Sequence, residues 1–251
     1  MTAASDLRIV DNPPALFEAA ADEFRRQASA AIGAEGRFTV ALSGGSTPKG
    51  LFSLLATNYR ERLHWEKMFF FWGDERHVPP DHPESNYRMA YEALLSKVPV
   101  PAGNVYRVAG EDPDVDRAAR QYEQTLREFF QPAAGAYPRF DLILLGMGPD
   151  GHTASLFPDT TALQEKSRWV VANRVEKLKT ERITFTLPVI NSAQVVMFLV
   201  GGGDKAVTLK EVLEGKQSAE LLPSKLVHPT SGKLIWLVDR AAAGALSRAG
   251  A

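Results

Sequence analysis

The stretch FDLILLGMGPDGHTASLFP, residues 140–158, decides the fold that this sequence predicts. It begins with an apolar run that is too short to span a membrane and that ends at glycine, so it predicts a strand buried on both faces. Gly146, Gly148 and Gly151 allow a sharp turn directly after that strand. Polar residues beyond the carboxyl end of such a strand lie where open α/β sheets bind ligands. The stretch therefore predicts an α/β protein with a functional site at this turn.

Asp150 and His152 are the candidate catalytic residues of the turn. An imidazole titrates near neutral pH, and a neighbouring carboxylate fixes its tautomer and raises its basicity. The simpler alternative is that Asp150 caps the next helix while His152 only packs, but three glycines that expose the pair favour a function. The glycine spacing also fits the dinucleotide pattern G-x-G-x-x-G. We discount that pattern because an anionic Asp150 would face the pyrophosphate and Pro149 removes an amide donor.

The composition is that of an ordinary globular protein. The 251 residues are 45% hydrophobic and 24% charged, which suits one large domain or two closely packed ones. A net charge of -1 gives no field for nucleic acid or an anionic membrane. The lack of cysteine excludes disulfides and a thiolate nucleophile. Because the chain starts without a secretion-signal pattern and has no run long enough for a membrane helix, we expect a cytoplasmic protein.

Further apolar runs and helical spacings fill the rest of the chain. Strands are predicted at 7–10, 38–42, 68–72, 169–172, 183–187, 195–200 and 234–238. Helices are predicted after Pro13, after Pro48, at 86–95, from Asp112, at 205–214 and from Arg240. We find no internal repeat and no long linker, so the elements predict a continuous fold.

The second informative stretch is SGGSTP, residues 43–48, which follows the strand predicted at 38–42. Thr47 suits a helix N-cap and Pro48 the first helical position, so the helix would begin with its free amides at this loop. Free amides behind two glycines and beside two hydroxyls form an anion site suited to a monophosphate. The alternative is an ordinary strand-to-helix turn. The candidate phosphate ligands are Gly44, Gly45, Ser46 and Thr47.

Charged residues follow two other predicted strands. Asp74 and Arg76 come directly after the strand at 68–72 and share one face, and Arg76 suits an oxyanion. For their neighbours Glu75 and His77 we expect a salt-bridged cluster, and no histidine has the spacing of a metal ligand. Lys205 follows the strand at 195–200 and starts a helix, where its charge opposes the helix dipole unless an anion lies in front of it. Lys205 is therefore a second candidate phosphate ligand, the alternative being a solvated lysine.

Five stretches together resemble a known family. They are LSGGSTP at 42–48, FWGDERHVPPDHPESNY at 71–87, LLGMGPDGHTASLFP at 144–158, RITFTLPVIN at 182–191 and GGGDKA at 201–206. In this order they resemble the 6-phosphogluconolactonases, within the superfamily shared with glucosamine-6-phosphate deaminase. The resemblance implies one α/β domain over residues 1–251, with a modified Rossmann-like (NagB-like), mostly parallel sheet and helices on both faces. It also implies hydrolysis of 6-phospho-D-glucono-1,5-lactone to 6-phospho-D-gluconate in the oxidative pentose phosphate pathway.

We expect the glycine loop, Lys205 and Arg182 to hold the phosphate while His152, oriented by Asp150, takes a proton from the attacking water. Arg76 or a backbone amide would stabilise the oxyanion, and Asp74 would support Arg76 or contact the substrate. We expect no metal, no organic cofactor and no nucleic-acid or membrane partner. The expected partner is a small sugar-phosphate lactone, bound by a monomer or a weak homo-oligomer.

Two other functions remain as alternatives. A deaminase carries an acid after the D-G-H turn for ring opening, and this sequence has Phe157 there, which cannot relay a proton. A non-catalytic sugar-phosphate sensor would need an attached DNA-binding module or basic patch, and the sequence has neither. Both observations favour the lactonase.

Overall fold

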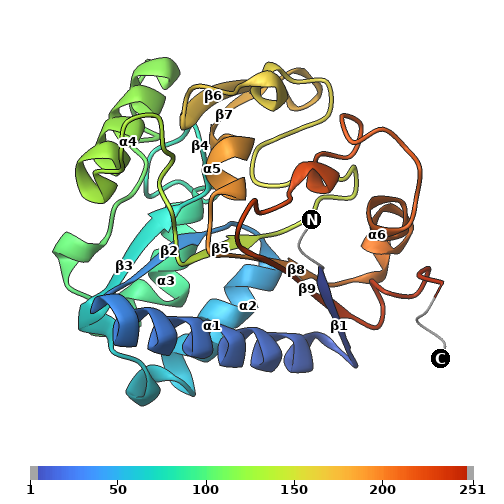
Figure 1. Ribbon diagram of the computed structural model, residues 1–251, viewed down its shortest axis with the longest axis horizontal. Coiled ribbons are helices and arrows are strands. Elements are labelled where there is room, and N and C mark those ends of the chain that lie inside the picture. The colour runs from blue at the N-terminus through green and yellow to red at the C-terminus, as the bar shows by residue number, and fades with distance from the viewer. Residues whose placement is uncertain (1–4, 248–251) are drawn as a thin grey trace.

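The computed structural model describes residues 5–247, and its centre is a six-stranded sheet in the order β1-β9-β8-β5-β2-β3 (Figure 1). Every neighbouring pair in this sheet is parallel. The six strands are β1 (Asp6–Val10), β2 (Phe38–Leu42), β3 (Met68–Trp72), β5 (Leu142–Leu145), β8 (Val195–Val200) and β9 (Lys233–Asp239). The predicted mostly parallel α/β sheet is confirmed. That residues 1–251 form a single domain stays a prediction.

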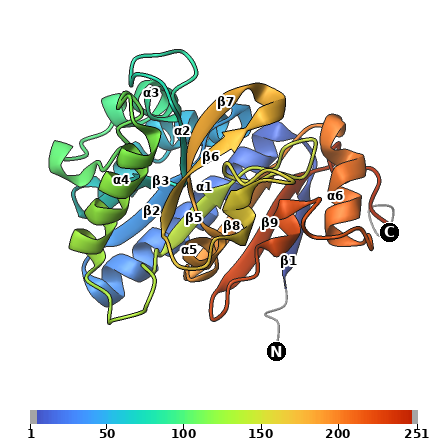
Figure 2. The ribbon, with the colours of Figure 1, turned by 90° about the horizontal axis from the view of Figure 1, so that it is seen from above.

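Helices cover both faces of this sheet (Figures 1 and 2). One face carries α1 (Pro13–Glu35), α2 (Ser46–Thr57) and α3 (Asn86–Ala93); the other carries α4 (Val115–Phe130) and α5 (Leu187–Asn191), and α6 (Ala206–Leu213) lies near β9. Local sequence explains the longest of them. Asn12 caps α1 by accepting from the amide of Ala15, two prolines fill its first turn, and Gly36 ends it with a left-handed φ of 74°.

A second, three-stranded sheet lies on the same side as α4 and was not predicted. It consists of β4 (Asp74–Arg76), β7 (Thr180–Phe185) and β6 (Val170–Val175), in that order and all antiparallel. β6 and β7 pack against α4. Because β4 follows β3 after the single residue Gly73, one short run of chain serves both sheets. The small sheet thereby carries the charged residues after β3 over the end of the large one.

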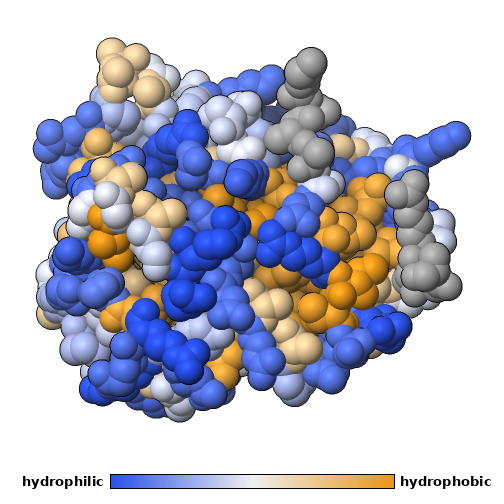
Figure 3. Space-filling model, turned by 60° about the horizontal axis from the view of Figure 1, so that its bottom comes forward, coloured by the Kyte–Doolittle hydropathy of each residue, from blue (hydrophilic) through white to orange (hydrophobic). Residues whose placement is uncertain are grey.

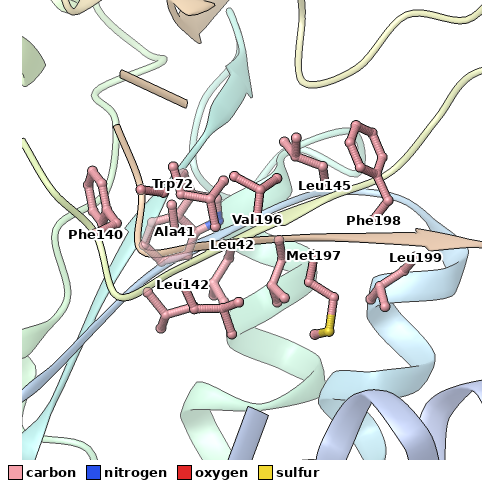
Figure 4. Close-up of a cluster of buried hydrophobic side chains, with 14 of the residues drawn as sticks. Ala41, Leu42, Trp72, Phe140, Leu142, Leu145, Val196, Met197, Phe198 and Leu199 are labelled. Atoms are coloured by element: carbon pink, nitrogen blue, oxygen red, sulfur yellow. The ribbon is translucent and has the colours of Figure 1, made fainter. Parts of the chain in front are cut away.

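The core lies between the large sheet and its two covering layers. β2, β5 and β8 are buried along their whole length, as expected for strands covered on both faces. Figure 4 shows side chains from these strands, among them Leu42, Leu145 and Met197, packed on both sides of the sheet, with Phe140 and Trp72 beside them. Burial of this many aliphatic and aromatic groups supplies the main driving force for folding. The sheet is therefore a rigid platform for the loops at its ends.

The order of the strands reverses between β2 and β5. From β2 the chain proceeds outward to β3, whereas from β5 it proceeds the other way to β8 and β9. Loops that leave the carboxyl ends of the two central strands therefore diverge, and a crevice forms between them. The loops in question are the two informative stretches of the sequence, after Leu42 and after Leu145.

Three local predictions were wrong. No helix follows Arg240: residues 240–247 form turns closed mainly by i→i−3 hydrogen bonds, and Gly244 favours that irregular backbone. α2 begins at Ser46 with Gly45 as its N-cap, so Thr47 lies inside the first turn. The strand predicted at 183–187 ends at Phe185, since Leu187 starts α5.

The large sheet ends at β1, where Leu7 and Ile9 are exposed. Figure 3 turns the bottom of the molecule forward and shows hydrophilic surface on the left of this face and apolar surface gathered on the right. Within residues 5–247 no helix has the length and apolar character needed to cross a membrane.

Candidate active site

One cleft of about 260 Å³ opens at the carboxyl ends of β2, β5 and β8. Two of the predicted site residues, Asp150 and Arg182, do not line it. All the others do: Gly44, Gly45, Ser46, Thr47, Asp74, Arg76, His152 and Lys205. Segments separated by more than a hundred residues of sequence thus meet at the crevice that the strand order creates.

The loop after β2 presents backbone donors to the cleft. Gly45 precedes α2 with a φ of 103°, a conformation that glycine adopts without strain. The first amides of a helix have no carbonyl within the helix to bond, and the helix dipole adds positive potential at the same point. Gly44 is required for space, since a Cβ there would collide with the side-chain amide of Asn86. This loop has the features of an anion-binding site.

Lys205 lines the same cleft as this loop. It ends a short 3₁₀ turn after β8, directly before α6, and its ammonium is paired with the exposed carboxylate of Asp204. The preceding Gly202 donates its amide to both carboxylate oxygens of the buried Asp239, at 3.0 and 3.2 Å. Asp239 thereby anchors the loop that carries the lysine.

His152 and Asp150 form a hydrogen-bonded pair in the turn after β5. The Nδ1 of His152 lies 2.5 Å from Oδ1 of Asp150, which also accepts from the His152 amide at 3.2 Å. Because an ionised carboxylate only accepts, Nδ1 carries the proton and Nε2 is left as an acceptor. Phe157 stacks on the imidazole with 4.1 Å between ring centroids. A Cβ at Gly148 would collide with the ring, so glycine is needed there.

The environment keeps this imidazole uncharged. Burial lowers the pKa of His152 to about 4; the Asp74 carboxylate opposes the shift, and the positive charges of Arg76, Arg182 and Lys205 add to it. The ordinary pKa of a histidine is near 6.5, and this lowered pKa means that the His152 ring is neutral at pH 7. A neutral imidazole with a free Nε2 in a cleft can accept a proton from water.

Arg76 and Asp74 lie side by side in the cleft, as their spacing predicts. Nη1 of Arg76 donates to the carbonyl of Glu84 at 2.9 Å, which fixes the guanidinium. The buried Asp74 accepts from the hydroxyl of Ser155 at 2.8 Å. Arg182 is the register partner of Arg76 across β4 and β7 and donates to the Thr180 hydroxyl, and it does not line the cleft. Burial lowers the pKa of Arg182, and the charge of Arg76 adds to the effect.

Two buried polar atoms at this cleft have no partner among the described residues. They are the hydroxyl of Ser43 and the Nε of Arg76, and both residues line the cleft. A buried donor without a partner costs free energy, and two such groups belong to residues that line this cleft. Between residues 5 and 247, no three His, Asp or Glu side chains are grouped so as to hold a metal ion.

Glu75 and His77 do not face the cleft. The buried Glu75 accepts from the amides of Arg76, Asn86 and Tyr87, and burial raises its pKa despite these bonds. The ring of His77 bonds to the carbonyl of Asp112 at 2.6 Å. Glu75 therefore fixes the loop before α3 through these amides and the Ser85 hydroxyl in place of a salt bridge, whereas Nδ1 of His77 lies 3.6 Å from the carboxylate of Glu181.

A family model described as glucosamine-6-phosphate isomerases/6-phosphogluconolactonase matches residues 11–236. The chain belongs to this family. It is 43% identical to the 6-phosphogluconolactonase of Nostoc sp. over 241 residues, which cover 96% of this chain and 98% of that relative. The family membership predicted from the five motifs is confirmed.

Solved structures of the family share the fold. A 6-phosphogluconolactonase from Trypanosoma cruzi superposes with a TM-score of 0.85 at 29% identity and 98% coverage of both chains. A monomeric glucosamine-6-phosphate deaminase of the NagB superfamily gives 0.78 over 96% of this chain and 99% of its own, but at 21% identity this likeness shows the fold alone. The NagB-like fold predicted from the sequence is confirmed.

Three residues at this cleft or in contact with its residues were not identified from the sequence. Ser155 supports Asp74, and its place in the SLFP motif was an available signal. Asn86 packs against Gly44 and donates to the carbonyl of Asp74 at 3.0 Å, yet in the sequence it is only the first residue of a predicted helix. Lys177 forms an ion pair with Asp150, and no local sequence pattern predicts this contact.

Proposed function

We propose that this protein hydrolyses 6-phospho-D-glucono-1,5-lactone to 6-phospho-D-gluconate. The observation that carries the proposal is that the loop at 43–48, which has the features of an anion site, lines the same cleft as a neutral, carboxylate-oriented His152. A phosphorylated lactone has the two features that this cleft matches, a terminal phosphate and an electrophilic ester carbon. The names of the relatives support the same activity.

The phosphate is held by the loop at 43–48 and by Lys205. The amides of Ser46 and Thr47 and the hydroxyl of Ser43 donate to the phosphate oxygens. The ammonium of Lys205 leaves the exposed carboxylate of Asp204 and pairs with the more highly charged phosphate. These contacts with the phosphate are remote from the reacting carbon of the lactone. Binding energy gained there places the lactone carbonyl at His152, which lowers the entropic part of the barrier.

The chemical step is attack of water on C1. Nε2 of His152 takes a proton from the water as its oxygen bonds to C1, and the carbonyl becomes an oxyanion. The bond between C1 and the ring oxygen then breaks, and the imidazolium returns its proton to that oxygen. The product is an open-chain hydroxy acid, which ionises. Asp150 stays ionised and holds Nδ1–H throughout.

Arg76 stabilises the oxyanion. Arg76 lines the cleft and its guanidinium is fixed by the carbonyl of Glu84, so its charge is in place before the reaction. Asp74 balances the charge of Arg76 and is itself fixed by Ser155. Arg182, the register partner of Arg76 on β7, adds positive potential to the site.

Phe157 separates this activity from deamination. A ring-opening deaminase needs an acid at this point, and here an apolar ring stacks on the imidazole instead. We further propose that the protein acts in the cytoplasm, as a monomer or weak homo-oligomer, on this small metabolite and without nucleic acid or a bound cofactor.

Two assays on one preparation test the activity. Base consumption at constant pH with the phosphorylated lactone, after subtraction of spontaneous hydrolysis, is expected to give a rate proportional to protein concentration. Ammonia release from glucosamine 6-phosphate is expected to stay at the blank. Ammonia release without lactone hydrolysis would overturn the proposal in favour of a deaminase, and no turnover in either assay would favour a sensor.

A further inference from the structure

Lys177 touches both groups that hold the imidazole of His152. It lies in the 3₁₀ turn Glu176–Leu178, which joins β6 to β7 in the small sheet. Its ammonium pairs with Oδ2 of Asp150, while Oδ1 of the same carboxylate is bonded to Nδ1 of His152. The ammonium also lies 5.2 Å from the ring centroid of Phe157, within cation–π range.

Lys177 does not line the cleft, and about half of its side chain is exposed. Its contacts with the site are with Asp150 and Phe157, so it is placed to act on the reaction through these two groups. We propose that Lys177 is a positioning residue for the proton transfer, which holds Asp150 and Phe157 in the arrangement that aims Nε2 of His152 into the cleft. This inference rests on the proposed role of His152 as general base.

The ammonium acts on Asp150 in two ways. It occupies Oδ2, so the carboxylate cannot rotate away from Nδ1 without breaking an ion pair. It also balances a negative charge that otherwise favours the imidazolium form of His152. The other charges around the ring are Asp74 and Arg76 on β4, Arg182 on β7 and Lys205 after β8. Of these only Asp74 is negative, so an uncompensated Asp150 would shift the balance toward protonation.

The test compares Lys177→Met with Lys179→Met, which removes an exposed lysine from the same turn. Because the ion pair of Lys177 is partly exposed, we expect Lys177→Met to lower kcat by about two- to fivefold with KM unchanged. The acid limb of kcat/KM is expected to move to higher pH, since protonation of His152 becomes easier. Lys177→Arg restores both values, and Lys179→Met leaves them as in the parent protein.

Several results would overturn this inference. They are an unchanged kcat and pH profile in Lys177→Met, a raised KM with unchanged kcat, which would mean substrate contact, and a Lys177→Arg protein as slow as Lys177→Met. Failure of the proposed function is seen separately. If His152→Ala keeps its turnover, the general base is elsewhere; if it loses turnover while Lys177→Met behaves as the parent, only the role of Lys177 is wrong.

Discussion

The phosphate loop after β2 and the histidine turn after β5 leave adjacent strands of the same sheet, yet they are built differently. The phosphate loop uses backbone amides, a helix N-terminus and the conformational freedom of Gly45, all of which are local. The histidine turn depends on side chains from elsewhere, with Lys177 from the small sheet holding Asp150. The loop after β2 is thus encoded largely by local sequence, whereas the histidine turn also depends on a tertiary contact.

The largest expected effect comes from removal of the base. His152→Ala is expected to lower kcat by about 10³-fold, because general base catalysis contributes on the order of 10²–10⁴. KM is expected to stay close to the parent value, since the phosphate loop is intact. Steady-state kinetics with spontaneous hydrolysis subtracted measures both. A turnover equal to that of the parent would remove the histidine turn from the chemistry.

Gly148→Ala tests whether the turn needs its side-chain packing. The new Cβ would collide with the His152 ring and displace it, so kcat is expected to fall by roughly 10²-fold, the cost of a misplacement near 1 Å. Gly103→Ala is the control, because no atom lies within 4 Å of its added Cβ. A Gly148→Ala protein with parental kcat and raised KM would mean that this glycine contributes to substrate binding. The two loops would then not differ in the way described.

Lys205→Ala tests phosphate binding instead of proton transfer. Loss of a charged hydrogen bond to the phosphate is expected to raise KM about tenfold to a hundredfold, with kcat changed much less. The effect is expected to shrink at high salt, which screens the parent interaction. Equal KM values for the two proteins would mean that Lys205 is only a solvated lysine, and the phosphate loop would then act alone.

The smallest effect is a difference between two pH profiles. Burial holds the pKa of His152 near 4 in the free protein, so its active, neutral form persists well below pH 6.5 and kcat/KM falls only as pH drops through that low value. A bound phosphate offsets the positive charge of Lys205 and raises the pKa of the ring. The acid limb of kcat is therefore expected at higher pH than that of kcat/KM. A kcat/KM limb at or above pH 6.5 would contradict the burial.

Local patterns in the sequence predicted the large sheet and the cleft well. The continuous apolar strands at 38–42, 68–72 and 195–200 were found with these bounds, because their burial on both faces leaves a strong signal. The small sheet was missed since β4 is three charged residues long and pairs with a strand about a hundred residues away. Loop closure of that kind has no local signature.

The same division holds for the site. Gly44 to Thr47, Arg76, His152 and Lys205 were found from turn chemistry and from charges that follow buried strands, and all line the cleft. Arg182 was proposed from the resemblance; it is the register partner of Arg76 and does not line the cleft. The supports Ser155 and Lys177 act through contacts 81 and 27 residues apart in the chain. Contacts between residues so far apart in the chain can be recognised only once the fold is known.

A structure with bound 6-phospho-D-gluconate tests the central claim most directly, namely that one molecule spans both regions. We expect the phosphate on the amides of Ser46 and Thr47 near Lys205, and the C1 carboxylate within hydrogen-bonding distance of Nε2 of His152 and Nε of Arg76. A product molecule whose phosphate occupies the loop while C1 points away from His152, or whose phosphate lies elsewhere, would contradict the account.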